Sequence, residues 1–161
     1  MLESIEKELR EWFVGSKKIV IAGIGNPIRQ DDYVGLKIVE GLHGNVSKDV
    51  LLLECETIPE SYLSDIEEFK PTHVLLIDAA FLGLKPAESS LVDADALTAD
   101  AAISTHVLPL RIFCDYIKEA TGAKVALLLV EPVSMEFGEG LHPEVAATGE
   151  RLTKILLRLL A

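Results

Sequence analysis

The fold is decided by residues 17–35, which read KKIVIAGIGNPIRQDDYVG. The apolar, β-branched run at residues 19–24 has the length and composition of a buried strand, and the glycines at its end predict a tight turn. Asp31 and Asp32 come just before a segment with helical hydrophobic spacing, where the N-cap of a helix belongs. The stretch therefore predicts a strand, a loop that carries two acids, and a helix.

The glycines at residues 23 and 25 have competing explanations. They form most of a dinucleotide-binding fingerprint, but Ile28 stands where the third glycine belongs, and the two acids would repel a pyrophosphate. We therefore disfavour a nucleotide-binding domain. The remaining alternatives are a plain turn before a capped helix, and a functional loop at the carboxyl end of a strand, where open α/β sheets bind their ligands.

The rest of the chain repeats this alternation of strands and helices. Unbroken apolar runs predict strands, and hydrophobic residues at helical spacing predict the helices between them. The expected strands are residues 18–24, 50–53, 73–78, 90–93 at an edge, and 124–130, and the expected helices are residues 2–14, 33–43, 59–70, 107–120 and 143–160. Buried strands between helices predict an α/β fold: a single-domain, three-layer α/β/α sandwich with a mostly parallel, twisted sheet of about five strands.

Composition limits the classes of function. A chain of 161 residues, with 49% hydrophobic and 25% charged residues, fits one globular domain over residues 1–161. The formal net charge of −11 argues against nucleic acid as a partner, because no basic excess exists to neutralise phosphates. Cys55 and Cys114 form no disulfide framework, and the sequence has neither a signal peptide nor a long apolar run. We therefore expect a cytoplasmic protein without membrane insertion.

The main candidate site consists of Asp32 after the first strand, Asp78 at the end of the third, and His106 before a helix. The topology brings these three residues to one edge of the sheet. Two carboxylates and an imidazole make a metal site with open positions, suited to nickel, zinc, manganese or iron. A cation would also relieve the repulsion between the carboxylates. The plainer explanations are a helix cap for Asp32, hydrogen bonds at a strand end for Asp78, and a cap or core role for His106.

Other polar residues are weaker candidates, and sequence motifs of zinc proteases, serine hydrolases and P-loop enzymes are absent. The weaker candidates are the strand-end acids Glu54, Glu56 and Glu131, as ligands or supporting groups, and His142, as a loop residue near the site. For His43 and His73 we expect surface roles or roles that complement a helix dipole. Cys55 is expected to be a small buried apolar residue.

Three ordered motifs resemble those of the nickel–iron hydrogenase maturation endopeptidases, the HycI and HybD-like proteins, and most closely the HycI type. Residues 23–26 and 31–35 are similar to the opening G-x-G-N…D-D/E-x-x-G of that family. Residues 76–80 are similar to its second acidic motif, and residues 104–106 to its S-x-H segment. The resemblance covers nearly the whole domain and places Asp32, Asp78 and His106 at the metal-ligand positions of the family.

The resemblance implies an enzyme that removes the C-terminal extension of a hydrogenase large-subunit precursor after nickel insertion. Asp32, Asp78 and His106 would be both its catalytic and its metal-binding residues, giving an aspartic-type endopeptidase that activates another enzyme. The nickel would be presented by the precursor rather than permanently bound, with zinc or cadmium able to substitute. We expect a monomer, whose helix at residues 1–15 is an addition to the family domain.

Two questions stay open from the sequence. A metal could polarise the scissile carbonyl or activate a water, or it could only position the bond while Asp32 or Asp78 acts as general base. The alternative function is a non-catalytic nickel-binding or metallochaperone module that uses the same three ligands.

Overall fold

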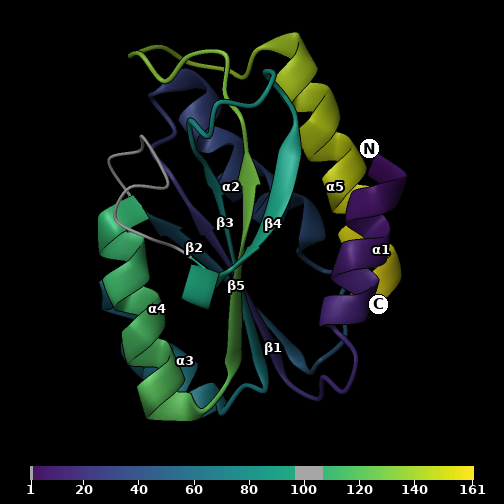
Figure 1. Ribbon diagram of the computed structural model, residues 1–161, viewed down its shortest axis with the longest axis vertical. Coiled ribbons are helices and arrows are strands. Elements are labelled where there is room, and N and C mark those ends of the chain that lie inside the picture. Colours follow the sequence, from purple (N-terminus) through teal and green to yellow (C-terminus); the bar gives the residue numbers. More distant parts are fainter. Residues whose placement is uncertain (1, 97–106) are drawn as a thin grey trace.

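The computed structural model describes residues 2–96 and 107–161, which form a central sheet with helices on both faces (Figure 1). The strands are β1 (Ile19–Ile24), β2 (Val50–Glu56), β3 (His73–Ala79), β4 (Ser89–Asp93) and β5 (Lys124–Val130). The α-helices are α1 (Leu2–Trp12), α2 (Val34–Leu42), α3 (Leu63–Phe69), α4 (Val107–Thr121) and α5 (Pro143–Leu160), and short 3₁₀ helices cover Gln30–Tyr33, Pro59–Tyr62 and Ala94–Ala96. The predicted α/β sandwich with a five-stranded sheet is confirmed.

The strand order is β2-β1-β3-β5-β4, and only β4 runs antiparallel to its neighbour. Ile21 in β1 pairs with Leu52 of β2 on one side and with Leu75 of β3 on the other. The predicted edge strand is β4, in which Leu91 lies opposite Leu128 of β5. Because the other strands are parallel, their carboxyl ends meet at one edge of the sheet, which is the upper end of the molecule in Figure 1.

The core has two halves, one on each face of the sheet. Helices α1, α2 and α5 cover one face, and α3 and α4 cover the other (Figure 1). Successive strand side chains point to alternate faces, so a strand covered on both sides is apolar along its whole length. The first face is lined by Ile19, Ile21, Leu75, Ile77, Leu128 and Val130, and the second by Val20, Ala22, Val74, Leu76, Leu127 and Leu129.

Gly35, at the second position of α2, is where this helix touches the sheet edge. A Cβ atom on Gly35 would lie 2.2 Å from the carbonyl oxygen of Ile77 and 2.8 Å from that of Ile24. Only glycine allows the backbones to approach so closely. The start of α2 is therefore seated on the carboxyl ends of β1 and β3, and the 3₁₀ turn that precedes α2 lies at the same edge.

Several local expectations were wrong. Helix α1 ends at Trp12 rather than at residue 14, and β2 continues to Glu56 rather than ending at residue 53. The N-cap residue of α2 is Tyr33, which makes no side-chain cap, so neither Asp31 nor Asp32 caps this helix.

Within the described ranges, no helix is long and apolar enough to cross a membrane.

His73 is buried, against the expectation of a surface role. Its ring packs edge-on against Trp12, with 5.0 Å between the ring centroids, because α1 covers the start of β3. Burial lowers the pKa of His73 below its ordinary value, and the nearby Lys124 lowers it further. His73 is thus a core residue at the amino end of β3, whereas Asp78 lies near the carboxyl end of the same strand.

Candidate functional site

Asp32 lies in the 3₁₀ turn Gln30–Tyr33 and is buried. Its Oδ2 accepts a hydrogen bond of 2.9 Å from the backbone N–H of Asn26. Gly25 has a φ of +147°, and a Cβ there would lie 1.8 Å from the backbone oxygen of Asp32. The glycine turn and the acidic turn of the opening stretch therefore fold onto each other, and this contact fixes the orientation of the Asp32 carboxylate.

Asp78 is the last residue but one of β3 and is fully buried. It alternates with Val74 and Leu76, so it lies on the face of the sheet that α3 and α4 cover. Its Oδ1 accepts a hydrogen bond of 2.8 Å from the backbone N–H of Ala79. Residue 77 pairs with Gly23 near the end of β1. The structure thus brings Asp32 and Asp78 to one edge of the sheet, as the topology predicted.

His106, the third predicted member of the site, lies outside the described residues. Helix α4, which begins at the next residue, covers the same face of the sheet on which Asp78 lies. Among residues 2–96 and 107–161, no group of three or more His, Cys, Asp or Glu side chains is placed to hold a metal ion. The ligand and catalytic roles of Asp32, Asp78 and His106 stay predictions.

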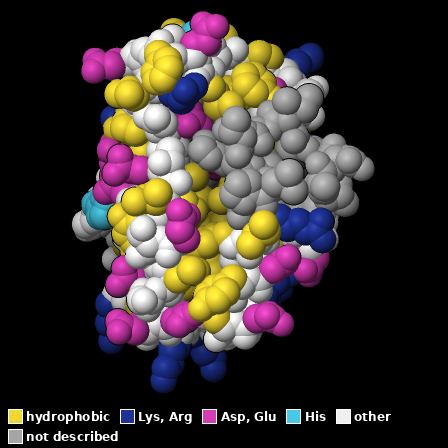
Figure 2. All heavy atoms as spheres, turned by 90° about the vertical axis from the view of Figure 1, so that its left-hand side faces the viewer, with side chains coloured by type: hydrophobic (Ala, Val, Ile, Leu, Met, Phe, Trp, Pro, Cys, Tyr) yellow, Lys and Arg dark blue, Asp and Glu magenta, His cyan; other side chains and the backbone are white. Residues whose placement is uncertain are grey.

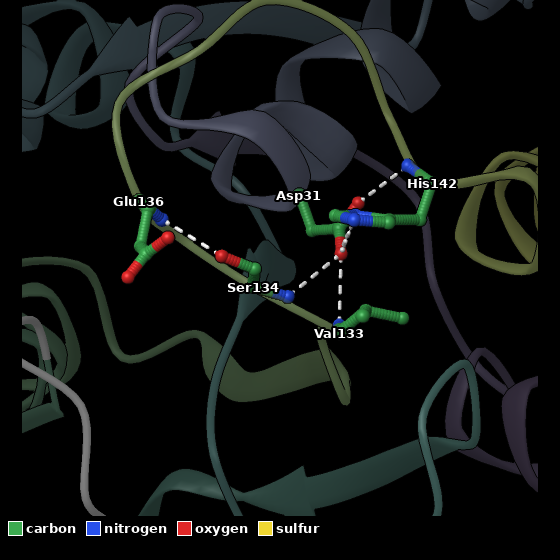
Figure 3. A network of polar contacts seen from close by, with 5 residues as sticks. All are labelled: Asp31, Val133, Ser134, Glu136 and His142. Atoms are coloured by element: carbon green, nitrogen blue, oxygen red, sulfur yellow. Dashed lines mark hydrogen bonds and ion pairs between the residues drawn. The ribbon is translucent and has the colours of Figure 1, made fainter.

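Asp31 is the residue whose role sequence reasoning missed. It is fully buried, and its carboxylate accepts four hydrogen bonds from the segment between β5 and α5 (Figure 3). Oδ2 accepts from the backbone N–H groups of Val133, at 2.8 Å, and Ser134, at 3.2 Å, and from Nδ1 of His142, at 2.9 Å. Oδ1 accepts from the backbone N–H of His142, at 2.8 Å. Because a carboxylate only accepts, Nδ1 of His142 carries the proton.

Two of the three strand-end acids that were weaker candidates, Glu131 and Glu54, make structural contacts. Oε1 of the buried Glu131 accepts hydrogen bonds from the backbone N–H groups of Leu82, at 2.7 Å, and Leu84, at 3.2 Å, and so holds the loop that follows β3. Glu54 pairs with His43 at the surface, with 3.0 Å between Oε2 and Nε2. The loop after β5 is therefore tied both to the loop after β3 and, through Asp31, to the loop after β1.

Both cysteines are buried, as expected for Cys55. Burial raises the pKa of the Cys55 thiol to about 12, and Asp65 and Glu60 add to this effect. Burial also raises the pKa of the Cys114 thiol to about 12, with a further contribution from Asp115. A thiol with such a pKa is almost entirely protonated at neutral pH. Neither cysteine is therefore a candidate nucleophile.

Known proteins are similar to this chain in sequence and in fold. The family model HycI, described as hydrogenase maturation protease, matches residues 36–159, a range that contains Asp78 and begins after Asp32. The chain is 31% identical over 152 residues to a candidate hydrogenase maturation protease of Methanocaldococcus jannaschii, covering 89% of each chain. It is 29% identical over 113 residues to the hydrogenase 3 maturation protease of Escherichia coli K12, covering 70% of this chain and 72% of the E. coli protein.

A solved structure supports the same family assignment as these sequence relatives. The crystal structure of the nickel–iron hydrogenase maturation protease HycI from Thermococcus kodakarensis superposes with a TM-score of 0.89 and is 38% identical in sequence. The similarity covers 95% of this chain and 98% of the T. kodakarensis chain. The chain therefore belongs to the HycI family of hydrogenase maturation proteases and is a peptidase.

Proposed function

We propose that this protein removes the C-terminal extension of a nickel–iron hydrogenase large-subunit precursor after nickel insertion, acting in the cytoplasm as a monomer. The observation that carries the proposal is the placement of two buried carboxylates, those of Asp32 and Asp78, at the carboxyl edge of the sheet in a chain of this family. In open α/β sheets this edge is where ligands bind. The reaction would activate another enzyme, the hydrogenase.

The nickel belongs to the substrate in this proposal. Asp32 and Asp78 would bind it while it sits in the precursor, with His106 as the third ligand, and zinc or cadmium could take its place. The donor set fits, since carboxylate oxygens and an imidazole nitrogen suit these metals. Burying two carboxylates at one edge costs free energy that a cation offsets. A bound metal supplies Lewis-acid polarisation of a carbonyl oxygen.

The residues of the chain supply orientation and proton transfer. The Asn26 N–H fixes the Asp32 carboxylate, and the Ala79 N–H fixes that of Asp78, so neither group has to be ordered when the substrate arrives. A carboxylate held in this way can accept a proton from the attacking water and return it to the leaving amine. Asp32 and Asp78 are therefore the proposed residues of an aspartic-type endopeptidase.

The test is intact-mass analysis of a matched large-subunit precursor mixed with the wild-type protein and with variants. We expect loss of a C-terminal peptide with wild type, and rates reduced by about 100-fold or more in Asp32→Asn, Asp78→Asn and His106→Ala. Asp49→Asn is the matched control, because Asp49 is exposed and lies just before β2, at the opposite edge of the sheet. Full activity in all three variants would refute the proposed site. Nickel binding without any cleavage by wild type would favour the metallochaperone alternative.

A further inference from the structure

We propose that Asp31 is a positioning residue. It holds the segment of residues 131–142, called here the β5–α5 loop, against the loop that carries Asp32, and the two loops together form the surface on which the precursor docks. The identity of the docking partner rests on the proposed function. The inference goes beyond that function by assigning a role to Asp31 and a surface to the partner.

The two loops are joined by backbone as well as by the Asp31 carboxylate. The N–H of Gln30 donates to the carbonyl of Gly138 at 3.0 Å, and the N–H of Gly138 donates to the carbonyl of Ile28 at 2.9 Å. The N–H of Asp31 donates to the carbonyl of Ser134 at 3.2 Å. Residues 28–31 thus run alongside the β5–α5 loop, with the carboxylate of Asp31 at the centre of the contact (Figure 3).

Asparagine cannot replace Asp31 in this arrangement. Both carboxylate oxygens accept from N–H groups, Oδ1 from His142 and Oδ2 from Val133, Ser134 and the His142 ring. Whichever oxygen became the amide nitrogen would face an N–H donor, and that donor would lose its acceptor. An Asp31→Asn variant therefore changes the hydrogen bonding of the loop with almost no change in side-chain volume.

The joined loops expose large hydrophobic side chains. Among the described side chains, those of Phe137, Ile28 and Val133 are 69%, 52% and 39% exposed. Ile58 and Leu84, on the loops after β2 and β3, are exposed at the same edge. Figure 2 shows hydrophobic side chains at the upper end of the molecule as well as lower on the same face, with a basic side chain among those at the upper end. Exposed apolar groups concentrated in one place indicate an interaction site.

Arg29 holds the most exposed of these groups in place. Its guanidinium lies over the ring of Phe137, 4.1 Å from the centroid, and its Nη1 lies 3.5 Å from the carbonyl oxygen of Met135. A cation over an aromatic face restricts where the ring can point. We call Ile28, Arg29, Val133 and Phe137 the clasped face, because Asp31 ties together the two loops that carry them.

The charges around the clasped face favour one kind of occupant. Glu136 and Glu139 are exposed on the β5–α5 loop, the one cation of the clasped face, Arg29, is stacked on the Phe137 ring, and the whole chain carries a net charge of −11. A partner that complements this surface presents apolar side chains flanked by lysine or arginine. The face adjoins Asp32 in the sequence and lies at the same edge of the sheet, beside the proposed site. We therefore assign the occupant as an apolar segment of the precursor with basic residues beside it.

The first test measures amide hydrogen exchange in full-length Asp31→Asn, with Asp49→Asn as control. We expect the amides of Val133, Ser134 and His142 to exchange about ten-fold faster in Asp31→Asn while β3 and β5 stay protected. Unchanged exchange at these three amides would overturn the positioning role of Asp31. A loss of protection throughout the sheet would also overturn it, since Asp31 would then support the whole fold.

The second test measures precursor cleavage by Asp31→Asn and by Phe137→Ser, whose side chain is exposed and not needed for the core. We expect KM to rise about five-fold or more in both variants, with kcat within about two-fold of wild type. A lower kcat at unchanged KM, or no change in either constant, would overturn the docking surface. So would a wild-type dimer that Phe137→Ser abolishes while KM is unchanged, because the occupant would then be a second copy.

The two tests separate this inference from the proposed function. If wild type cleaves no matched precursor, the proposed function and the assignment of the occupant both fail. The exchange of the Val133, Ser134 and His142 amides still decides whether Asp31 positions the loop, because that measurement needs no substrate.

Discussion

Gly35 lies directly against the carbonyl oxygen of Ile77, so close that a Cβ atom at residue 35 would come within 2.2 Å of that oxygen. This contact seats the start of α2 on the end of β3, one residue before Asp78. It therefore fixes the distance at which the turn that carries Asp32 passes the strand that carries Asp78. The geometry of the candidate site depends on a residue that takes no part in its chemistry.

Gly35→Ala should therefore destabilise the protein. The new methyl group must push α2 away from the strand ends, and overpacking of this kind costs about 1–3 kcal/mol. The measurement is chemical denaturation, with Gly149→Ala as control. At Gly149, in α5, a Cβ would lie 3.4 Å from Val34 Cγ2, an ordinary contact, so alanine should be neutral or stabilise by about 0.5–1 kcal/mol. Equal stabilities for wild type and Gly35→Ala would show that the contact is not restrictive.

Metal ions should stabilise the free protein through Asp32 and Asp78. An ion that binds only the folded state at 100 times its dissociation constant adds about 2.7 kcal/mol to the free energy of unfolding. We expect zinc or cadmium to raise the melting temperature of wild type, and this rise to be lost in Asp32→Asn and in Asp78→Asn. Differential scanning calorimetry of each protein with and without metal measures this rise in melting temperature. The same rise in both variants would place the metal elsewhere.

The cysteines should resist alkylation in the native state. With a pKa of about 12 for both Cys55 and Cys114, only about one thiol in ten thousand is ionised near pH 8. Iodoacetamide should therefore modify neither cysteine in native buffer and both in denaturant, as counted by intact mass. Rapid modification of Cys55 in the native protein would contradict its assignment as an inert core residue.

Protonation of His73 should lower the free energy of unfolding of the protein at acidic pH. Its pKa is lowered in the folded state, so the unfolded chain binds a proton more readily than the folded one does. The contribution of the neutral His73 ring to the free energy of unfolding is complete at pH values above the ordinary pKa of about 6.5. It is lost as the pH falls through the lower pKa that His73 has in the folded protein. The melting temperature of His73→Gln should fall less than that of wild type as the pH drops below about 6.5. Parallel curves would contradict this assignment.

The order of strands and helices could be predicted because hydrophobic periodicity is a local signal. The run at residues 19–24 and the run at residues 125–130 are buried on both faces, and burial on both faces requires unbroken apolar sequence. The placement of Asp32 and Asp78 at one edge followed from topology alone, because Asp32 lies in the connection that follows β1 and Asp78 lies at the carboxyl end of the parallel strand β3.

The role of Asp31 could not be predicted, because its partners are 102 to 111 residues away in the chain. Locally it looks like a helix cap, and nothing near it in sequence distinguishes a cap from a buried anchor. The same holds for Glu131, whose partners Leu82 and Leu84 lie 49 and 47 residues away. Long-range contacts between polar side chains and backbone amides leave no periodic pattern in the sequence.

The most direct measurement is intact-mass analysis of a matched large-subunit precursor after incubation with the wild-type protein, once with nickel inserted and once without nickel. A nickel-reading endopeptidase should release the C-terminal peptide only from the nickel-containing precursor. Release from both forms would refute the proposal that the protein recognises nickel, but it would still establish the peptidase activity. Release from neither form would contradict the central claim that this chain matures a nickel–iron hydrogenase.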